Sequence, residues 1–205
     1  MADDRLFCPH HAHRLNDERR LIDQVSEAEL ARLLALRGDE DVADLGSGTG
    51  FYTDRIAALT TGTVYAVELQ AEMNELYRGR GVPANVQLVA GDVADLPLPP
   101  SSIDVACSIA AWHETRGALD LPGLLEILRP QGRLVLIDWR RDPESWASGP
   151  PAELRSTKEE VARELSPFFA AVETENIGRF MFAAVARRGT ARSTVRGRGQ
   201  RPAPA

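Results

Sequence analysis

The sequence predicts an α/β domain with a doubly wound, mostly parallel seven-stranded sheet whose last strand is antiparallel. Three observations support this fold class. An apolar run at 41–45 leads into a glycine-rich turn and then into a helical pattern. Strand-like runs then alternate with helical ones to about residue 165, as a parallel sheet requires. Two strand-like segments, 172–177 and 180–186, follow around a Gly-Arg turn and indicate an antiparallel pair.

Length and composition are those of one globular domain with a full core. The chain has 205 residues, 43% of them hydrophobic and 26% charged. No apolar run is long enough to span a bilayer, and the polar N-terminus resembles no signal peptide. Two cysteines, Cys8 and Cys107, are too few for a disulfide framework, so we expect a cytoplasmic protein with reduced thiols. Cys107 lies in an apolar strand and is expected in the core.

The net charge of −6 is unevenly distributed. Residues 187–205 contain six arginines and no acid; without them the chain has 18 basic and 30 acidic residues. An acidic body disfavours a nucleic-acid partner, because phosphate binding needs clustered positive charge. From residue 189 onward the composition predicts a disordered Arg-rich tail. Such a tail could attract RNA, which remains an alternative partner.

Residues 1–26 are predicted to form an N-terminal lead-in or a lid. They contain a cluster of possible metal ligands, namely Cys8, His10, His11 and His13. No second cluster completes a tetrahedral site, and the spacing matches no standard zinc finger. We therefore predict no metal site.

Two helices are expected before the first strand. The spacing of apolar residues predicts one helix over 17–25. Ser26 and Glu29 then form a capping-box pattern that begins a second helix, with an apolar stripe and a stop at Gly38. Helices in this position cover the edge of the sheet.

The glycine turn separates two classes of nucleotide-binding proteins. Gly46, Gly48 and Gly50 alternate between the strand and a helix expected over 51–59. A dinucleotide fingerprint would need its third glycine at position 51, which is Phe51. The spacing therefore disfavours a nicotinamide-dependent oxidoreductase.

With Asp44 ahead of it, the turn reads Asp-x-Gly-x-Gly-x-Gly. It resembles motif I of the class I S-adenosylmethionine-dependent methyltransferases. The resemblance implies that the turn wraps the methionine part of the cofactor and that Asp44 helps to orient it. Free N–H groups at the start of the following helix face the ligand in such a corner.

Two further acids follow strands at fitting intervals. Glu68 ends the strand expected at 63–67, where a carboxylate can accept both ribose hydroxyls. After a helix over 70–78, the strand 86–90 ends in Gly-Asp and resembles the adenine-binding motif of the family. By that resemblance Asp92 accepts from the exocyclic amino group and Val93 packs near the ring. The predicted cofactor-binding residues are Asp44, Gly46, Ser47, Gly48, Thr49, Gly50, Glu68, Leu69, Asp92, Val93 and Ser108.

The acceptor side is predicted where the fourth and fifth strands end. A proline-rich turn at 96–100 leads into the fourth strand, and the segment 108–114 follows it. Ligands in doubly wound sheets lie at the carboxyl ends of strands, so Trp112, His113 and Trp139 are expected near the methyl group. His113 could remove a proton from a hydroxyl or carbon acid as the catalytic base, or it could only shape the pocket. The segment departs from the Asn-Pro-Pro-aromatic pattern of methyltransferases acting on base or glutamine amino nitrogens.

The remaining elements complete the fold. A helix at 121–128 precedes a turn, Leu-Arg-Pro-Gln-Gly-Arg-Leu, that resembles the family's turn before its fifth strand, here 134–137. A Gly-Pro-Pro loop at 149–151 could form a wall of the acceptor pocket. Ser156 and Thr157 cap a last helix that runs to about Leu165.

The resemblance extends over the methyltransferase domain that we place at 27–188. It is strongest to the small type 11 group related to quinone-biosynthesis C-methyltransferases; arsenic methyltransferases need more thiolates than this chain has. It implies the class I methyltransferase fold, with S-adenosylmethionine as cofactor. The expected function is methyl transfer to a small-molecule acceptor by in-line displacement. The alternatives are a cofactor-binding module without transferase activity and an RNA methyltransferase.

Overall fold

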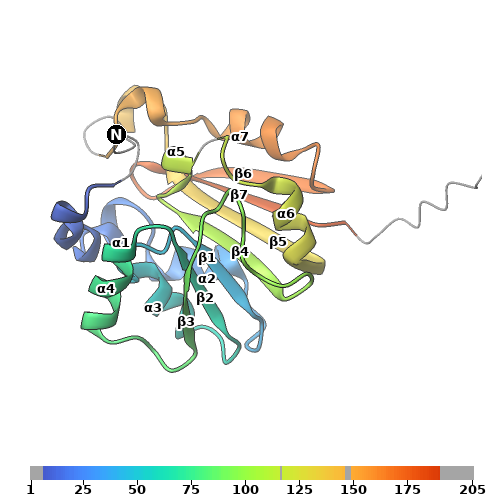
Figure 1. Cartoon of the computed structure of the whole chain (residues 1–205). Helices are drawn as coiled ribbons and strands as arrows, with labels where there is room; N and C mark the ends of the chain where they lie inside the picture. Colours follow the sequence, from blue (N-terminus) through green and yellow to red (C-terminus); the bar gives the residue numbers. More distant parts are fainter. Residues whose placement is uncertain (1–6, 116, 146–148, 190–205) are drawn as a thin grey trace, which may run out of the picture.

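A computed structural model describes residues 7–115, 117–145 and 149–189 of the chain. Its centre is one seven-stranded sheet with the order β3-β2-β1-β4-β5-β7-β6 (Figure 1). Strands β1 to β5 are parallel, and β7 runs antiparallel between β5 and β6. The predicted fold class is therefore confirmed. The strands are β1 Val42–Leu45, β2 Val64–Glu68, β3 Val86–Ala90, β4 Ile103–Ile109, β5 Leu128–Trp139, β6 Ala171–Ile177 and β7 Met181–Arg187.

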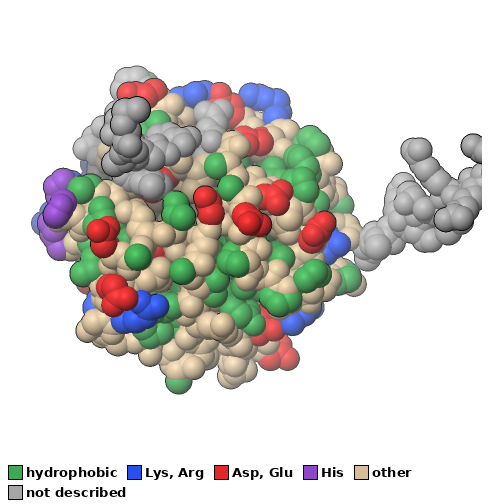
Figure 2. All heavy atoms as spheres, viewed as in Figure 1, with side chains coloured by type: hydrophobic (Ala, Val, Ile, Leu, Met, Phe, Trp, Pro, Cys, Tyr) green, Lys and Arg blue, Asp and Glu red, His purple; other side chains and the backbone are tan. Residues whose placement is uncertain are grey.

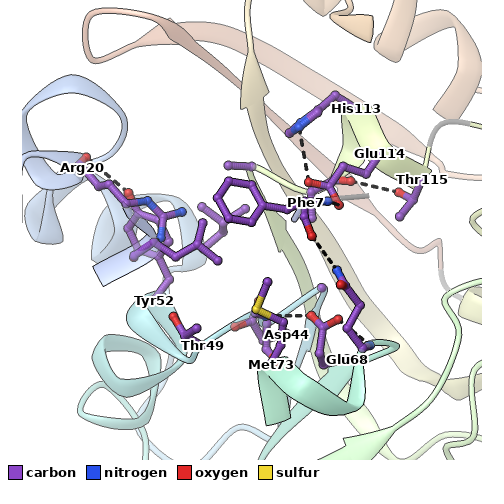
Figure 3. A pocket seen from close by; sticks show the side chains of 18 of the residues that line it. Phe7, Arg20, Asp44, Thr49, Tyr52, Glu68, Met73, His113, Glu114 and Thr115 are labelled. Atoms are coloured by element: carbon purple, nitrogen blue, oxygen red, sulfur yellow. Dashed lines mark hydrogen bonds and ion pairs between the residues drawn. The ribbon is translucent and has the colours of Figure 1, made fainter. Parts of the chain in front are cut away.

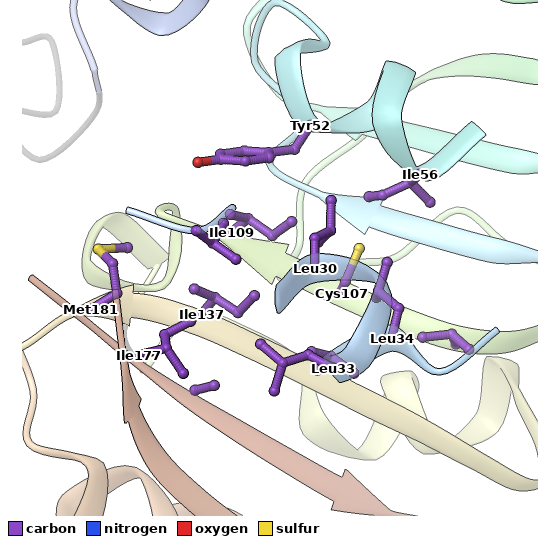
Figure 4. Close-up of a cluster of buried hydrophobic side chains, with 14 of the residues drawn as sticks. Leu30, Leu33, Leu34, Tyr52, Ile56, Cys107, Ile109, Ile137, Ile177 and Met181 are labelled. Carbon is purple, nitrogen blue, oxygen red and sulfur yellow. The ribbon is translucent and has the colours of Figure 1, made fainter. Parts of the chain in front are cut away.

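Helices cover both faces of the sheet, as two hydrophobic faces require. The helices are η1 Pro9–Asn16, α1 Arg20–Asp23, α2 Glu27–Leu34, α3 Phe51–Ala57, α4 Ala71–Arg80, α5 Trp112–Thr115, α6 Leu121–Ile127, η2 Pro143–Ser145, η3 Ala152–Leu154 and α7 Lys158–Leu165. Helices α2 and α3 contribute to one buried cluster, shown in Figure 4, and α6 and α7 to the other. Among the described residues, none of the helices has the length and apolar composition needed to cross a bilayer.

Side chains along each strand point alternately to the two faces of the sheet, and this alternation divides the core into the two clusters. In β5, Val135 and Ile137 face the cluster of α2 and α3, whereas Leu134 and Leu136 face that of α6 and α7. Cys107 is fully buried in the first cluster, as expected. Successive residues of one strand therefore pack against helices on opposite faces of the sheet.

The helix that begins at the Ser26 capping box ends earlier than predicted. Both hydrogen bonds of the box are present, but α2 stops at Leu34, and Ala35 adopts a left-handed conformation. The buried Arg133 guanidinium donates to the Leu34 and Ala35 carbonyls and pairs with Glu40 (3.0 Å). The distant Arg133 side chain thus supplies hydrogen bonds to carbonyl groups that are free at the end of the helix. Gly38 lies in the loop after this end.

Other boundaries differ by a few residues. The helix predicted over 17–25 is limited to α1, because Gln24 leaves helical geometry. Strand β5 begins at Leu128 rather than 134. The Thr157 capping box is present with Glu160 and begins α7. Of the predicted tail, nearly all lies outside the described residues, and a cytoplasmic location stays a prediction.

The histidines of the N-terminal segment gather at one edge of the molecule, over η1 (Figure 2). Cys8, His10, His11 and His13 are all exposed. Within the described part of the chain, no group of three or more potential ligands is placed to hold a metal ion.

We predict that Gly50→Ala destabilises the fold. Gly50 has φ of +83°, and an added Cβ would lie 2.2 Å from the Tyr77 ring. Strain and overpacking together are expected to lower the free energy of unfolding by about 2–4 kcal/mol, measured by urea denaturation. Gly79→Ala is the control: it lies in α4 with open space around it, and we expect no loss of stability. A loss below about 0.5 kcal/mol for Gly50→Ala would contradict the close fit.

Candidate functional site

A cavity of about 540 Å³ opens at the carboxyl ends of strands β1 to β5 (Figure 3). This edge includes the point between β1 and β4 where the strand order reverses, the usual ligand site of open α/β sheets. The volume is in the range of small-molecule sites. The wall combines the predicted glycine turn with the ends of these five strands and the N-terminal segment.

The glycine turn brings backbone close to the cavity. Gly46 and Gly48 both have positive φ, and a Cβ on Gly46 would lie 2.7 Å from the Ala111 Cβ. Only glycine satisfies both constraints at position 46. Between them, Ser47 is part of the cavity wall, and its buried hydroxyl has no hydrogen-bond partner within the described residues. A buried unpaired hydroxyl at a cavity wall indicates a place for a ligand atom.

Glu68 joins the turn to the end of β2. The Gly48 N–H donates to Glu68 Oε2 (2.8 Å), and the Gln70 N–H donates to Oε1 (2.8 Å). Each carboxylate oxygen keeps a further lone pair for a ligand hydroxyl. Burial raises the pKa of Glu68, although these backbone donors oppose the rise.

Asp44 lies deeper, at the end of β1. Its Oδ2 accepts from the Thr53 hydroxyl (2.6 Å), and Oδ1 lies 3.7 Å from the Cys107 sulfur. The pKa of Asp44 is raised to about 6 overall, because the effect of burial outweighs that of these hydrogen bonds, which lower it. A cationic ligand nearby would favour the charged carboxylate.

Asp92 is the third of the predicted cofactor-binding acids in the cavity wall. It is exposed, and its Oδ1 accepts from the Ala94 N–H (2.9 Å). Asp44, Glu68 and Asp92 thus line one hollow from three strand ends, with Leu69 and Val93 between them.

All but two of the predicted cofactor-binding residues line this cavity. Gly50 does not, because it begins α3 and packs against Tyr77. Ser108 does not either: it is buried within β4, before the strand reaches the cavity. Neither residue lies in the cavity wall, so the cavity does not support their assignment to the cofactor site.

Trp112 is also misplaced by the prediction. Its side chain is 1% exposed and packs into the cluster of α6 and α7, outside the cavity wall. The next two residues, His113 and Glu114, face the cavity instead. Of the predicted acceptor-side residues, His113 and Trp139 line the cavity.

His113 is held by the carboxylate of Asp138 at the end of β5. Its Nδ1 lies 2.9 Å from Asp138 Oδ1, and its backbone N–H donates to Oδ2 (3.0 Å). The Trp139 N–H also donates to this carboxylate (2.6 Å). Burial lowers the pKa of His113, but the charge and hydrogen bond of Asp138 outweigh it and raise the pKa overall. The pairing directs Nδ1 to Asp138 and leaves Nε2 for other partners.

Glu114 is the next group on the cavity wall. Its Oε1 lies 3.6 Å from His113 Nε2, and its Oε2 accepts from the Phe7 N–H (3.2 Å). The pKa of Glu114 is raised to about 7 overall, because the effect of burial outweighs that of the His113 charge, which lowers it. Glu114, with its raised pKa, and the His113 ring therefore share this corner of the cavity (Figure 3).

The N-terminal segment lies across the cavity. The Phe7 carbonyl accepts from the Gln70 side-chain amide (3.1 Å), so Phe7 bridges Glu114 and the loop after β2. The Thr49 hydroxyl donates to Asn16 Oδ1 (2.9 Å). Phe7 and Leu15 are part of the cavity wall. These contacts place the segment where a lid would have to lie.

Sequence reasoning missed several residues of the site. Asp138, which holds His113 from outside the cavity wall, lies at a predicted strand end, which was a usable signal, and Glu114 follows the predicted base. Arg20 and Gln24 carry no motif, and only the folding of the N-terminal segment brings them to the cavity. Tyr52 lies there because α3 follows directly from the glycine turn.

Comparisons with known proteins find a family model and relatives that match the region containing this site. A family model described as a methyltransferase domain matches residues 43–136. An uncharacterized methyltransferase of Mycobacterium tuberculosis is 37% identical over 101 residues, covering 49% of this chain and 40% of that protein. The demethylmenaquinone methyltransferase of Clavibacter sepedonicus is 30% identical over 123 residues, covering 59% of this chain and 50% of the relative.

Two further matches cover more of the chain. The 27-O-demethylrifamycin SV methyltransferase of Amycolatopsis mediterranei is 29% identical over 154 residues, covering 70% of this chain and 52% of that protein. A crystal structure of an S-adenosylmethionine-dependent methyltransferase from Aquifex aeolicus has a TM-score of 0.78 and 26% identity, covering 89% of this chain and 99% of that one. The chain spans only about 40% to 50% of the length of these curated relatives.

We predict that Glu114→Gln reduces the loss of stability with rising pH. The folded pKa of about 7 lies above that of an unfolded glutamate, so the folded state binds more protons. The resulting stability is complete below about pH 4.3 and is lost as the pH rises through about 7. Between pH 6 and 8 this group accounts for about 1 kcal/mol, measured by urea denaturation.

The raised pKa of His113 also makes the protein less stable as the pH rises, and His113 remains in the variant. The free energy of unfolding of Glu114→Gln should therefore still fall with pH, but with a smaller slope than in the wild type. The exposed Glu72→Gln on α4 is the control and should keep the full slope. Equal slopes for the wild type and Glu114→Gln would contradict the raised pKa.

Proposed function

We propose that this chain, which carries a class I S-adenosylmethionine-dependent methyltransferase domain, transfers the methyl group of that cofactor to a small-molecule acceptor by in-line displacement. One observation carries the proposal: a single cavity is lined by Asp44, Glu68 and Asp92 on one side and by His113 and Trp139 on another. Two relatives named for a demethylrifamycin and a demethylmenaquinone support a small acceptor.

The cavity suits S-adenosylmethionine, the cofactor of this domain class. Its volume fits a nucleoside of that size, and the buried Ser47 hydroxyl needs a partner that a ligand can supply. When bound, S-adenosylmethionine supplies a methyl group that its sulfonium has already activated. The protein then has to bind both reactants, align them and exclude water.

The cofactor-side residues have distinct roles in the proposal. The free lone pairs of Glu68 accept the two ribose hydroxyls, and Asp92 accepts the exocyclic amino group of the adenine. Val93 and Leu69 pack near the ring. The glycine turn and Asp44 hold the amino acid end, where the carboxylate attracts the ammonium group.

His113 is the proposed catalytic base. Asp138 accepts from Nδ1–H, so Nε2 carries the lone pair that takes a proton from an acceptor hydroxyl or carbon acid. The proton then resides on Nε2, and the Asp138 carboxylate stabilises the imidazolium. Trp139, held by its own N–H on the same carboxylate, forms a wall of the acceptor space.

The segment from Phe7 to Asn16 acts as a lid in this proposal. Its backbone contacts to Glu114 and Gln70 close the cavity from outside. Holding two reactants in line in an enclosed space can be worth about 7–11 kcal/mol of the barrier. The fold thus contributes mainly by positioning.

The test combines binding and turnover. Calorimetry should detect one molecule of S-adenosylhomocysteine or S-adenosylmethionine per chain; absence of heat from both would contradict the cofactor assignment. Incubation with S-adenosylmethionine and a panel of phenols, quinols and polyketide-like alcohols should release S-adenosylhomocysteine with at least one acceptor. Release that depends on RNA, and on no small molecule, would contradict the acceptor class.

We predict that His113→Gln lowers kcat about 10²- to 10⁴-fold, because the general base is lost. The affinity for S-adenosylhomocysteine, measured by calorimetry, should change little. Asp138→Asn should also lower kcat and shift its pH profile, since the amide no longer orients and stabilises the imidazolium. The exposed His10→Gln is the control and should keep full activity. If His113→Gln retains at least half of the wild-type kcat, His113 is not the base.

A further inference from the structure

The indole ring of Trp139, the last residue of β5, packs against three groups. It stacks on the Phe180 ring, with 6.2 Å between the centroids and 24° between the planes. Gly149 lies so close that an added Cβ would be 2.6 Å from the indole. The Arg155 guanidinium lies over the same ring, 5.4 Å from its centroid. Trp139 and Gly149 both line the cavity, so these contacts set the position of one part of its wall.

Arg155 joins this ring to the chain that follows β5. The residue is only 2% exposed. Its Nε donates to the Pro150 carbonyl (2.8 Å), and its Nη1 donates to the carbonyls of Ser145 (2.7 Å) and Arg140 (3.4 Å). Pro150 is a further residue of the cavity wall. One buried side chain therefore connects Trp139 and Pro150, two parts of the same wall.

The charge of Arg155 also acts on the proposed base and its partner. Burial lowers the pKa of Arg155, and the Asp138 carboxylate raises it. At His113, burial lowers the pKa and the carboxylates of Asp138 and Glu114 raise it, whereas the Arg155 charge lowers it. The charges that act on the imidazole thus come from β5, from α5 and from the residue after η3. Arg155 is the cation among them.

Packing alone does not account for an arginine at this position. Burying a guanidinium costs free energy, and a well-packed apolar side chain in its place is often neutral or stabilising. An arginine adds what an apolar side chain lacks, namely several N–H donors in one plane and a permanent positive charge. The contacts of Arg155 with Trp139 and Pro150 lie on the proposed acceptor side of the cavity.

We infer that Arg155 is a positioning residue for the acceptor half of the reaction: it holds Trp139 and Pro150 in the cavity wall, and its charge acts on the His113–Asp138 pair. The inference rests on the proposed function, which assigns these residues to the acceptor. The two contributions can be separated. Lysine supplies the charge, whereas stacking on the indole and binding several carbonyls need the planar guanidinium.

The charge is tested on the free protein, without cofactor or acceptor. NMR titration follows the His113 ring, whose signal is identified by its loss in His113→Gln. Arg155→Met should raise the pKa of His113 by about half a unit or more, because a nearby cation is removed. Arg155→Lys should keep the pKa close to the wild-type value.

The shape of the wall is tested in turnover, with an acceptor that releases S-adenosylhomocysteine. Arg155→Met and Arg155→Lys should both raise KM for this acceptor about 10-fold, the loss expected for about 1.4 kcal/mol of acceptor contacts. Gly149→Ala forces the indole to move but leaves Arg155 in place. It should raise KM in the same way and leave the pKa of His113 unchanged. All three variants should bind S-adenosylhomocysteine within about threefold of wild type by calorimetry, which also shows that they are folded.

Arg163→Met, which removes an exposed cation from α7, is the matched control and should change neither the His113 pKa nor KM. An unchanged His113 pKa in Arg155→Met would overturn the role of the charge, and an unchanged KM would overturn the role in the wall. Equal losses of cofactor and acceptor binding would mean that Arg155 only stabilises the fold, and would overturn both. Failure of the wild-type protein to bind S-adenosylhomocysteine would instead contradict the proposed function, whereas the NMR titration would still decide the effect of the charge.

Discussion

The hydrogen bond from the Gly48 amide to the Glu68 carboxylate is the contact on which the site depends. It ties the turn after β1 to the end of β2, so one backbone conformation positions both. The turn can adopt that conformation because Gly46 and Gly48 accept positive φ and leave room for Ala111. Glu68 is thereby held beside the cavity with lone pairs to spare. A side chain at position 46 would displace the turn, and with it the carboxylate.

The cavity concentrates buried charge at the cost of stability. Asp44, Glu68 and Glu114 all have raised pKa values because burial disfavours their charged forms. A protein without a ligand to bind would gain from apolar residues at these positions. Local violations of packing rules of this kind occur where function needs them. The cation Arg20 lies in the same cavity wall as these acids, and a wall that carries both signs of charge suits a ligand of mixed charge.

On the proposed reaction side, too, a single residue holds several parts of the site in place. Near the end of β5, the Asp138 carboxylate contacts the His113 ring and accepts from the backbone N–H groups of His113 and Trp139. One residue thus fixes the proposed base and an aromatic wall together. Phe7 of the N-terminal segment lies at the same corner, and its N–H donates to Glu114 next to His113. In the proposed function, acceptor binding and the position of the lid therefore depend on the same cluster of side chains.

Local signals in the sequence predicted much of this arrangement. The glycine spacing and the acids at strand ends identified Asp44, Glu68 and Asp92, because parallel strands all end at one edge of the sheet. Trp112 and Ser108 were misplaced because spacing along a chain does not reveal which side a residue faces at a strand end. The end of α2 depends on Arg133, about a hundred residues away, and Arg20 reaches the cavity only through packing of a short helix. Contacts of that range leave no local pattern.

A crystal structure of the protein with S-adenosylhomocysteine tests the central claim most directly. The account predicts that the ribose hydroxyls lie on Glu68, that the adenine lies beside Asp92 and Val93, and that the sulfur faces His113. A nucleoside bound elsewhere, or a Glu68 carboxylate that contacts no ligand hydroxyl, would contradict it.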